Sequence, residues 1–322
     1  ASMADISIKG SANIKMAGKD LSTNTFTTQS SSQNMDIDIT GSNGATKVFA
    51  HLDIDNAASA GGDETSTYGG TINVDKLYMT TAIGSVNVKA GDWSSCVGMV
   101  EGVQKCTTTD NSISLSTKVG GYTVGVSGGM SNDSANNSFS VSGKVAGLDF
   151  KIKENENTYT NISVKGDVAV GTGTGFYVEH MNRDAADSDA TLIAAHTVIN
   201  GVTVKAASWE ADTAGVTAAS NTGEIRPLGT SLVGDYHTAH ATTLATIKDI
   251  KGVGANMDIQ GNNVNVVVGE YDTAALNGLD FADVVVTRKL AAGTTLDMSY
   301  GKIDTSATAD TTNFGAIINV KF

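Results

Sequence analysis

The segment DISIKGSANIKM, residues 5–16, alternates apolar and polar side chains almost without interruption. Its even positions carry the apolar residues Ile6, Ile8, Ala12, Ile14 and Met16. Its odd positions carry only charged, hydroxyl or amide side chains. Successive side chains of a strand point to opposite faces of its sheet, so this segment predicts a strand with one apolar and one polar face.

The same alternation recurs along the chain and decides the fold class. It is found in residues 35–39, 48–54, 86–90, 148–153, 162–170, 296–300 and 314–322. Two all-β folds use this pattern. A soluble sandwich buries its apolar faces between two sheets, whereas a membrane barrel turns them to lipid and lines a wet lumen with the polar faces.

Composition favours the barrel. Aromatic residues make up 6% of the 322 residues, which is little volume for a close-packed core, whereas a lipid-facing surface requires only apolarity. No stretch of 18 apolar residues occurs, which excludes a transmembrane helix, but a barrel strand crosses with about 9–11 residues. The chain has 34 acidic and 21 basic residues, and its net charge of −13 argues against nucleic acid as a partner.

The connections between strands alternate in length. Short ones such as GSNGA (41–45), VGGY (119–122) and VAGL (145–148) alternate with longer Gly-, Ser-, Asn- and Asp-rich stretches. This rhythm predicts tight turns at one rim and loops at the other. At about 20 residues per strand and connection, the chain predicts a 16-stranded transmembrane antiparallel β-barrel, with 18 strands as the alternative. Residues 1–322 form one domain in this interpretation.

Four stretches carry a family resemblance. The end of the chain, NFGAIINVKF (313–322), alternates and finishes on Phe322, similar to the terminal strand that serves as an assembly signal in bacterial outer-membrane barrels. LYMTTAIGSVNVKAGDW (77–93) and NSISLSTKVGGYTVGVSGG (111–129) resemble the porin strand pairs before and after the constriction loop. DVVVTRKLAAGTTLDMSYGKID (283–304) is similar to the late porin hairpin. The chain thus resembles the Gram-negative general porin family.

This resemblance has several implications. It implies location in the bacterial outer membrane and passive diffusion of small hydrophilic solutes and ions through a water-filled pore. It also implies a homotrimer, insertion by the barrel-assembly machinery through Phe322, no enzymatic activity and no cofactor. The main alternative is a soluble or surface-layer all-β structural protein.

The resemblance also implies that residues 92–111 fold inward as a constriction loop. Asp92, Glu101 and Asp110 would then place carboxylates near the narrowest point, and Lys105 would offset one of them. Cys96 and Cys106 are close in sequence, which is compatible with a loop-closing disulfide in an oxidising compartment, with two free thiols as the alternative.

A basic wall is expected opposite this loop. The chain has only three arginines, so the wall must be mostly lysine, and four lysines of the early strands have lumen parity: Lys9, Lys15, Lys47 and Lys89. Charges of opposite sign across a narrow wet passage create a transverse field that sorts solutes by charge. The alternative is local pairing with the carboxylates of Asp36, Asp38 and Asp53. The net charge of −13 favours cations.

Metal and catalytic sites have weak signals. Asp184, Asp187 and Asp189 are candidates for calcium, which prefers clustered oxygens, but such a run is more often a solvated loop, and we expect no metal. The five histidines show no spacing that singles out a catalytic set.

The alternation also predicts which side chains meet lipid. The lysines of the basic wall should face the lumen. The opposite parity should face lipid at Ile6, Ile8, Ile14, Val48, Leu52, Val86, Val88, Phe150, Leu296 and Phe322.

Overall fold

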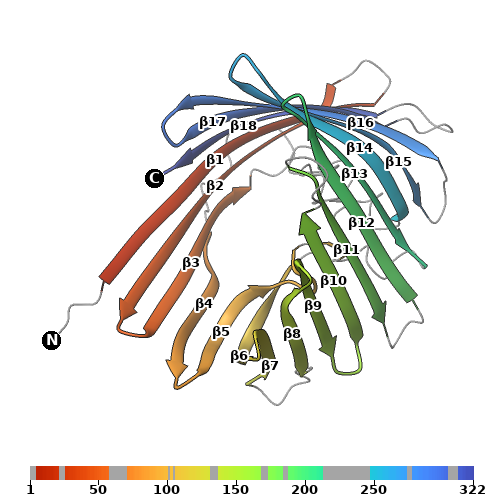
Figure 1. The fold of residues 1–322 in the computed structure, drawn as a ribbon. Helices are drawn as coiled ribbons and strands as arrows, with labels where there is room; N and C mark the ends of the chain where they lie inside the picture. The colour runs from red at the N-terminus through yellow and green to blue at the C-terminus, as the bar shows by residue number, and fades with distance from the viewer. Residues whose placement is uncertain are drawn as a thin grey trace.

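A computed structural model gives the fold. It describes residues 5–21, 26–57, 71–100, 102–103, 106–130, 137–167, 173–183, 188–212, 247–273, 278–303 and 311–322. These residues form one antiparallel sheet of 18 strands that closes on itself (Figure 1). The strands are β1 (Asp5–Leu21), β2 (Phe26–Asn43), β3 (Thr46–Ala57), β4 (Thr71–Ile83), β5 (Val86–Ser95), β6 (Thr107–Val119), β7 (Tyr122–Gly129), β8 (Ser138–Val145), β9 (Leu148–Asn155), β10 (Tyr159–Asp167), β11 (Gly175–Arg183), β12 (Ser188–Ile199), β13 (Val202–Ala211), β14 (Ile247–Ile259), β15 (Asn262–Thr273), β16 (Leu279–Ala291), β17 (Thr294–Ile303) and β18 (Thr311–Lys321).

The first and last strands close the barrel. β1 pairs with β18 from Ser11 opposite Lys321 to Leu21 opposite Thr311. The backbone of Phe322 extends this ladder: its N–H donates to the Gly10 carbonyl at 2.9 Å, and its carbonyl accepts from the Gly10 N–H at 2.8 Å. Each of the 18 described strands is therefore paired on both sides, as a closed barrel requires. The structure has the higher of the two strand numbers that the sequence predicted.

The two rims of the barrel differ as the connection lengths predicted. Within the described residues, seven connections are two-residue turns, and all seven lie at one rim. They are residues 44–45, 84–85, 120–121, 146–147, 200–201, 260–261 and 292–293. Gly44 and Gly84 both have a φ of 61°, which the tight hairpin turn requires and which glycine adopts without a steric penalty.

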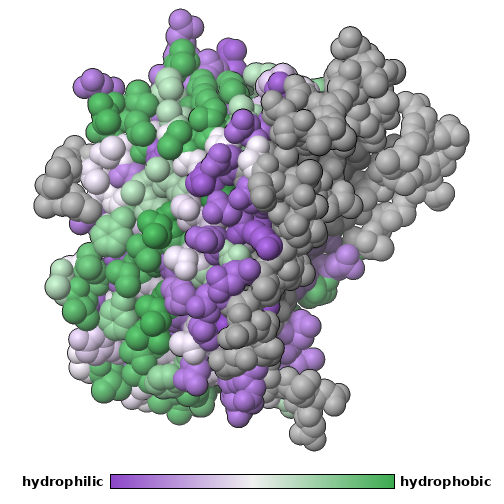
Figure 2. Space-filling model, turned by 90° about the vertical axis from the view of Figure 1, so that its right-hand side faces the viewer, coloured by the Kyte–Doolittle hydropathy of each residue, from purple (hydrophilic) through white to green (hydrophobic). Residues whose placement is uncertain are grey.

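The two faces of the sheet follow the predicted parity. On β1, Ile6 and Ile8 are 70% and 64% exposed on the outer face, and the cross-strand partner of Lys9 on the inner face is Asp38. On β12, Ile193 is exposed outside while its neighbour Leu192 is buried inside. The residues predicted to meet lipid all share the outward parity. Figure 2 shows apolar side chains over a broad area of this outer face, bordered by hydrophilic ones. Among the described residues, no helix is long and apolar enough to cross a membrane.

Candidate functional site

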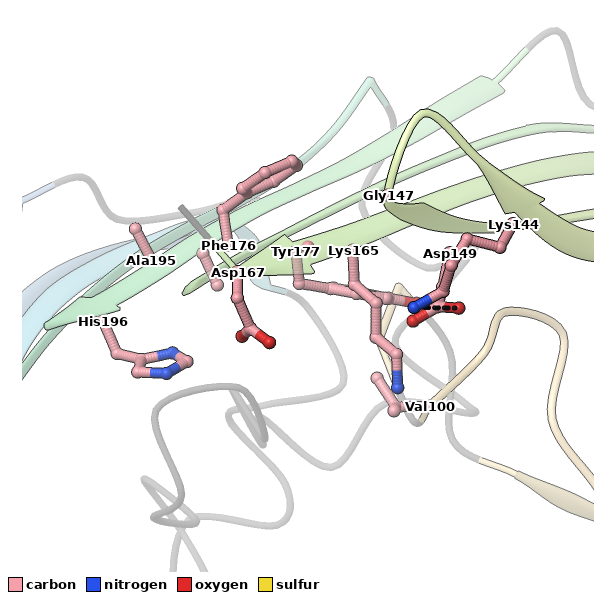
Figure 3. Close-up of a pocket in the computed structure, with 12 residues that line it drawn as sticks. Val100, Lys144, Gly147, Asp149, Lys165, Asp167, Phe176, Tyr177, Ala195 and His196 are labelled. Atoms are coloured by element: carbon pink, nitrogen blue, oxygen red, sulfur yellow. Dashed lines mark ion pairs between the residues drawn. The ribbon is translucent and has the colours of Figure 1, made fainter. Parts of the chain in front are cut away.

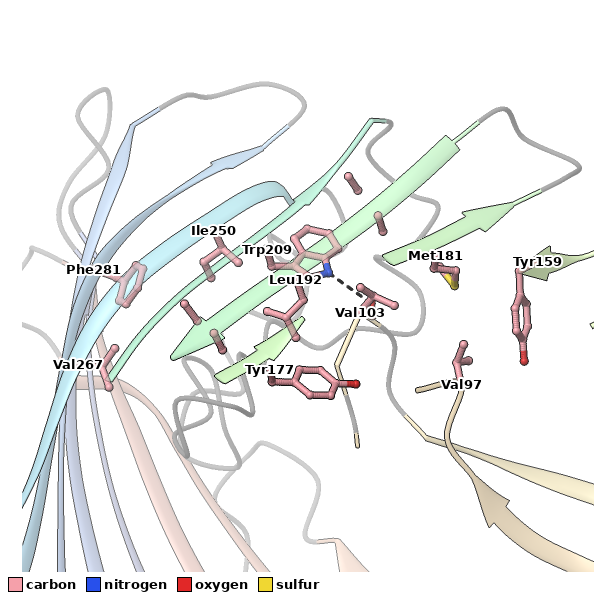
Figure 4. Close-up of a cluster of buried hydrophobic side chains, with 14 residues drawn as sticks. Val97, Val103, Tyr159, Tyr177, Met181, Leu192, Trp209, Ile250, Val267 and Phe281 are labelled. Atoms are coloured by element: carbon pink, nitrogen blue, oxygen red, sulfur yellow. Dashed lines mark hydrogen bonds between the residues drawn. The ribbon is translucent and has the colours of Figure 1, made fainter. Parts of the chain in front are cut away.

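The connection between β5 and β6 folds into the barrel and packs on its inner wall. Val103, in this connection, is fully buried, and it packs with Tyr177, Leu192 and Trp209 of β11, β12 and β13 (Figure 4). The indole Nε1 of Trp209 donates to the Val103 carbonyl at 3.4 Å. The inward fold is therefore confirmed. We call this connection, residues 96–106, the inner loop. It is shorter than the predicted 92–111 because β5 and β6 pair as far as Ser95 and Thr107.

A buried carboxylate holds the inner loop against the wall. Glu179 of β11 is 0% exposed. Its Oε2 accepts hydrogen bonds from the Val103 N–H at 3.2 Å and the Tyr177 hydroxyl at 2.6 Å. Its Oε1 accepts from Asn161 Nδ2 at 2.8 Å. Burial of a charged group is costly unless hydrogen bonds compensate for the lost water, and these three donors supply that compensation.

Two glycines of the inner loop allow this close approach. A Cβ on Gly98 would lie 2.6 Å from the Tyr177 hydroxyl oxygen and closer still to Glu179 Oε1. A Cβ on Gly102 would overlap Glu179 Oε2. Only residues without a side chain fit here, so the loop backbone rests directly on the carboxylate.

Lysines of β9 hold the beginning of the same loop. Lys151 Nζ donates to the carbonyls of Cys96 and Gly98, at 3.0 and 2.7 Å. Lys153 Nζ lies 3.4 Å from the Ser95 hydroxyl, to which it donates. Because carbonyl groups carry no formal charge, the positive charge of Lys151 is not cancelled by these bonds. Lys151, which contacts the loop, and Lys153, which contacts the last residue of β5, thus both lie on β9, a strand that sequence reasoning did not assign to the basic wall.

The predicted disulfide is present. Cys96 and Cys106 are bonded to each other, and no described cysteine is free. The bridge joins the two ends of the inner loop, next to the first residue of β6. It shortens the free backbone between the two strands, so the loop tip has fewer conformations available.

The predicted acidic residues occupy different positions. Asp92 lies in β5, where its Oδ1 accepts the Asn111 N–H at 2.5 Å. Asp110 is exposed in β6. Both are in the strands that carry the inner loop rather than in the loop itself. Glu101 and Lys105 lie outside the described residues.

The predicted basic residues of the early strands lie on the inner face where they are described. Lys9 and Lys47 are exposed there. The Nζ of Lys89 lies 4.0 Å from the centroid of the Tyr78 ring and 5.0 Å from that of Trp93. The side chain of Lys15 is outside the described residues.

The carboxylates of Asp36, Asp38 and Asp53 do have local partners, but the partners that the structure shows are not the predicted lysines. His51 contacts both neighbouring carboxylates, with ring nitrogens 3.6 Å from Asp36 Oδ1 and 2.8 Å from Asp38 Oδ1. Asp53 accepts a hydrogen bond from Asn34 at 2.9 Å. In the part of the chain that the structure describes, the ion pairs of Asp36 and Asp38 are both with His51. The partner of Asp36 and Asp38 that sequence reasoning overlooked is thus His51.

Charge is distributed unevenly around the inner face. The parity of β9 and β10 that faces inward includes Lys151, Lys153 and Lys165. Across the barrel, β2, β3, β16 and β17 contribute inward-facing carboxylates: Asp36, Asp38, Asp53, Asp283 and Asp297. The same parity of β9 and β10 also carries Asp149 and Asp167, so this wall has three lysines and two carboxylates, and carboxylates predominate among the inward-facing residues named on the walls across from it.

The calcium candidates are described only in part. Asp184 and Asp187 lie outside the described residues. Asp189 accepts a hydrogen bond from Asn182 at 2.7 Å, and its Oδ2 lies 3.8 Å from His180 Nε2. Within the described residues, no group of three or more His, Cys, Asp or Glu side chains could hold a metal ion.

Sequence reasoning missed Glu179, Lys151 and Trp209 as functional positions. Lys151 was visible as a member of the polar parity of 148–153, and Glu179 as the end of the strand-like run FYVE at 176–179. Neither signal shows which loop the side chain meets, because Val103 and Glu179 are 76 residues apart.

Comparisons with known proteins agree with this architecture. No protein-family model and no curated protein sequence matches the chain. Among solved structures, it is similar to Pseudomonas aeruginosa OccK1 (OpdK), with a TM-score of 0.69, 11% identity and coverage of 99% of this chain and 98% of that one. It is also similar to Pseudomonas aeruginosa OccK10 (OpdN), with a TM-score of 0.66, 12% identity and 99% coverage of both chains. For Acinetobacter baumannii OccAB1 the TM-score is 0.64, with 11% identity and coverage of 99% and 96%. The chain therefore has the barrel fold of Gram-negative outer-membrane porins, as its sequence predicted, with 18 strands, the number expected from the sequence as the alternative to 16.

Proposed function

We propose that the protein is a porin of the bacterial outer membrane, through which small hydrophilic solutes and ions diffuse passively. One observation carries this proposal: a closed barrel turns an apolar face outward and a charged face inward, with a loop folded into its lumen. The solved structures that share the fold are outer-membrane porins, which supports the same function and location.

The positions of the lysines indicate which face of the barrel wall contacts water. A lysine at the lipid midplane costs roughly 2–4 kcal/mol, so the parity that carries Lys9, Lys151 and Lys153 belongs to water. The opposite parity, with Ile6 and Ile8 more than half exposed, belongs to lipid. A soluble or surface-layer protein would leave these apolar side chains in water, and this is the reason we favour the porin.

Transport through such a pore needs only a solute gradient. The inner loop narrows the lumen and the uneven charge of the wall adds a transverse field, so permeation depends on solute size and charge. We propose a modest preference for cations, because the net charge is −13 and the walls opposite Lys151 are rich in carboxylates. Asp92, Glu101, Asp110 and Lys89 remain proposed contributors to that preference. We expect no enzymatic activity and no bound cofactor.

Assembly is part of the proposal. Phe322 directly follows β18, the strand that closes the barrel, so recognition of this segment by the barrel-assembly machinery would couple insertion to closure. We propose a homotrimer, as the sequence resemblance implies.

Reconstitution tests this function. The purified full-length protein, added to a planar lipid bilayer, is expected to produce discrete conductance steps, and a salt gradient is expected to give a reversal potential of cation-selective sign. Protein unfolded before addition is the control. A folded preparation that gives no conductance, or that dissolves on chelation without detergent, would contradict the porin assignment in favour of the surface-layer alternative.

A further inference from the structure

A cavity of about 630 Å³ lies between the inner loop and the part of the barrel wall that β8 to β12 form. Its wall is built from β8 to β12, and Val100 of the inner loop lies on its other side (Figure 3). Tyr177 and Ala194 add apolar surface to the lining, and three side chains that can carry charge also point into it: Lys165, Asp167 and His196. A volume of this size is typical of sites for small ligands.

Two opposite charges stand unpaired in this cavity. Lys165 and Asp167 are both exposed, and neither has an ion pair or hydrogen bond within the described residues. The other two charged groups of the lining, Lys144 and Asp149, neutralise one another at 3.6 Å. The cavity therefore offers one ammonium group and one carboxylate to a solute.

The backbone keeps these two charges apart. Residues 165 and 167 are two positions apart on β10, so their side chains leave the same face with Cα atoms about 6.6 Å from each other. Figure 3 shows the Lys165 side chain extending toward Val100, whereas Asp167 projects toward the side where His196 lies. A ligand between them would meet a positive group at one end and a negative group at the other.

We propose that this cavity binds small zwitterions of the α-amino acid class, with the ligand carboxylate at Lys165 and the ligand ammonium group at Asp167. This inference rests on the proposed porin function and names a class of solute for that pore. A singly charged solute would satisfy one of the two groups, and an uncharged solute neither. Tyr177 and Val100 offer apolar contact to the carbon skeleton of the ligand.

Binding at this site must be weak for transport to occur. A pore site has to be favourable enough to attract a solute and weak enough to release it. Because the cavity is open to the wet lumen, solvent screens both charges, which fits this requirement. The zwitterion would occupy the passage beside the inner loop for a short time and reduce the ion current while it is there.

The test uses single-channel conductance of the full-length protein in about 0.1 M KCl, where charges act over about 10 Å. L-alanine is the zwitterionic probe. Propionamide has a similar size without charge, and propionate and ethylammonium each carry one of the two charges. We expect L-alanine to reduce the conductance in a saturable way, at lower concentration than the other three solutes.

Variants assign the effect to the two side chains. Lys165→Gln and Asp167→Asn should each raise the half-saturating concentration of L-alanine about five-fold, because each removes one charged partner. The double exchange Lys165→Asp with Asp167→Lys restores both charges in reverse order and should return the value to near that of the original protein. Lys118→Gln removes an exposed lysine with inward parity on β6, outside the cavity, and should leave the response unchanged.

The outcomes separate the two proposals. Absence of any conductance would overturn the porin function and this inference with it. A conducting pore that responds equally to L-alanine and propionamide would overturn the zwitterion site alone. The same holds for a pore in which neither single variant shifts the half-saturating concentration.

Discussion

Substitution of Gly102 by alanine is the sharpest perturbation of the inner loop. The new Cβ would overlap Glu179 Oε2, which already accepts hydrogen bonds from the Val103 N–H and the Tyr177 hydroxyl. Glu179 is fully buried and is held from a third direction by Asn161, so the carboxylate cannot move away easily. We therefore expect the loop, rather than the wall, to give way.

The cost follows from the bonds that the loop would lose. Displacement breaks the bond between Val103 and the Glu179 carboxylate and the bond from the Lys151 ammonium group to Gly98, and both involve a charged group. Such bonds contribute about 1.5–3 kcal/mol each, so the two together amount to about 3–6 kcal/mol. Since each 1.4 kcal/mol is a factor of ten, the closed position of the loop would lose about a hundred-fold or more in its equilibrium population.

Single-channel recording measures this loss. Gly102→Ala should show a larger mean conductance and more open-channel noise, because a displaced loop narrows the lumen less and samples several positions. Glu179→Gln should show a smaller change in the same direction: the amide keeps one acceptor oxygen for two of the three donors and turns a donor toward the remaining one.

The matched control is Gly41→Ala, because a Cβ at Gly41 meets no atom within 4 Å and its φ is ordinary. Heat-dependent mobility in gels checks that each variant has folded. If folded Gly102→Ala conducts like Gly41→Ala, with equal noise, the inner loop does not set the width of the pore and the reasoning is wrong.

Three further changes test other parts of the structure. Cysteine placed at Lys9 should react with a membrane-impermeant thiol reagent while cysteine at Ile8 is protected, and the reverse pattern would contradict the assignment of the faces. Reduction of the bridge between Cys96 and Cys106 should increase open-channel noise without abolishing conductance, and unaltered noise would show that the other contacts suffice to hold the loop. Deletion of Phe322 removes two backbone hydrogen bonds at the closing seam and should lower the yield of heat-shiftable folded barrel, whereas a normal yield would exclude its role in assembly.

Much of the fold could be predicted from side-chain alternation alone. Parity separates the inner from the outer face of a strand, because a strand that meets lipid on one side and water on the other has to alternate. It placed Ile8 and Phe150 outside and Lys9 and Lys89 inside, as the structure has them. The connection lengths also predicted that the tight turns lie together at one rim.

The number of strands was harder to predict. β7, β8 and β9 have only eight residues each, and a turn of two residues joins β8 to β9, so the strand boundaries are weak in the sequence. The alternation within one strand does not show which distant strand pairs with it to close the barrel. The pairing of β1 with β18, which fixes the number, joins the two ends of the chain.

The contacts of the inner loop could not be predicted for a related reason. Alternation predicts that Lys9 and Lys151 both face inward, and it gives no reason to expect one of them nearer the loop than the other. In the barrel they are separated by the circumference: Lys9 pairs in register with Asp38, and Lys151 lies beneath the inner loop and donates to its backbone. Only the closed register shows which of them is near the loop. The side chains that contact the inner loop are thus determined by the position of their strand around the closed barrel. The sequence of a single strand does not show that position.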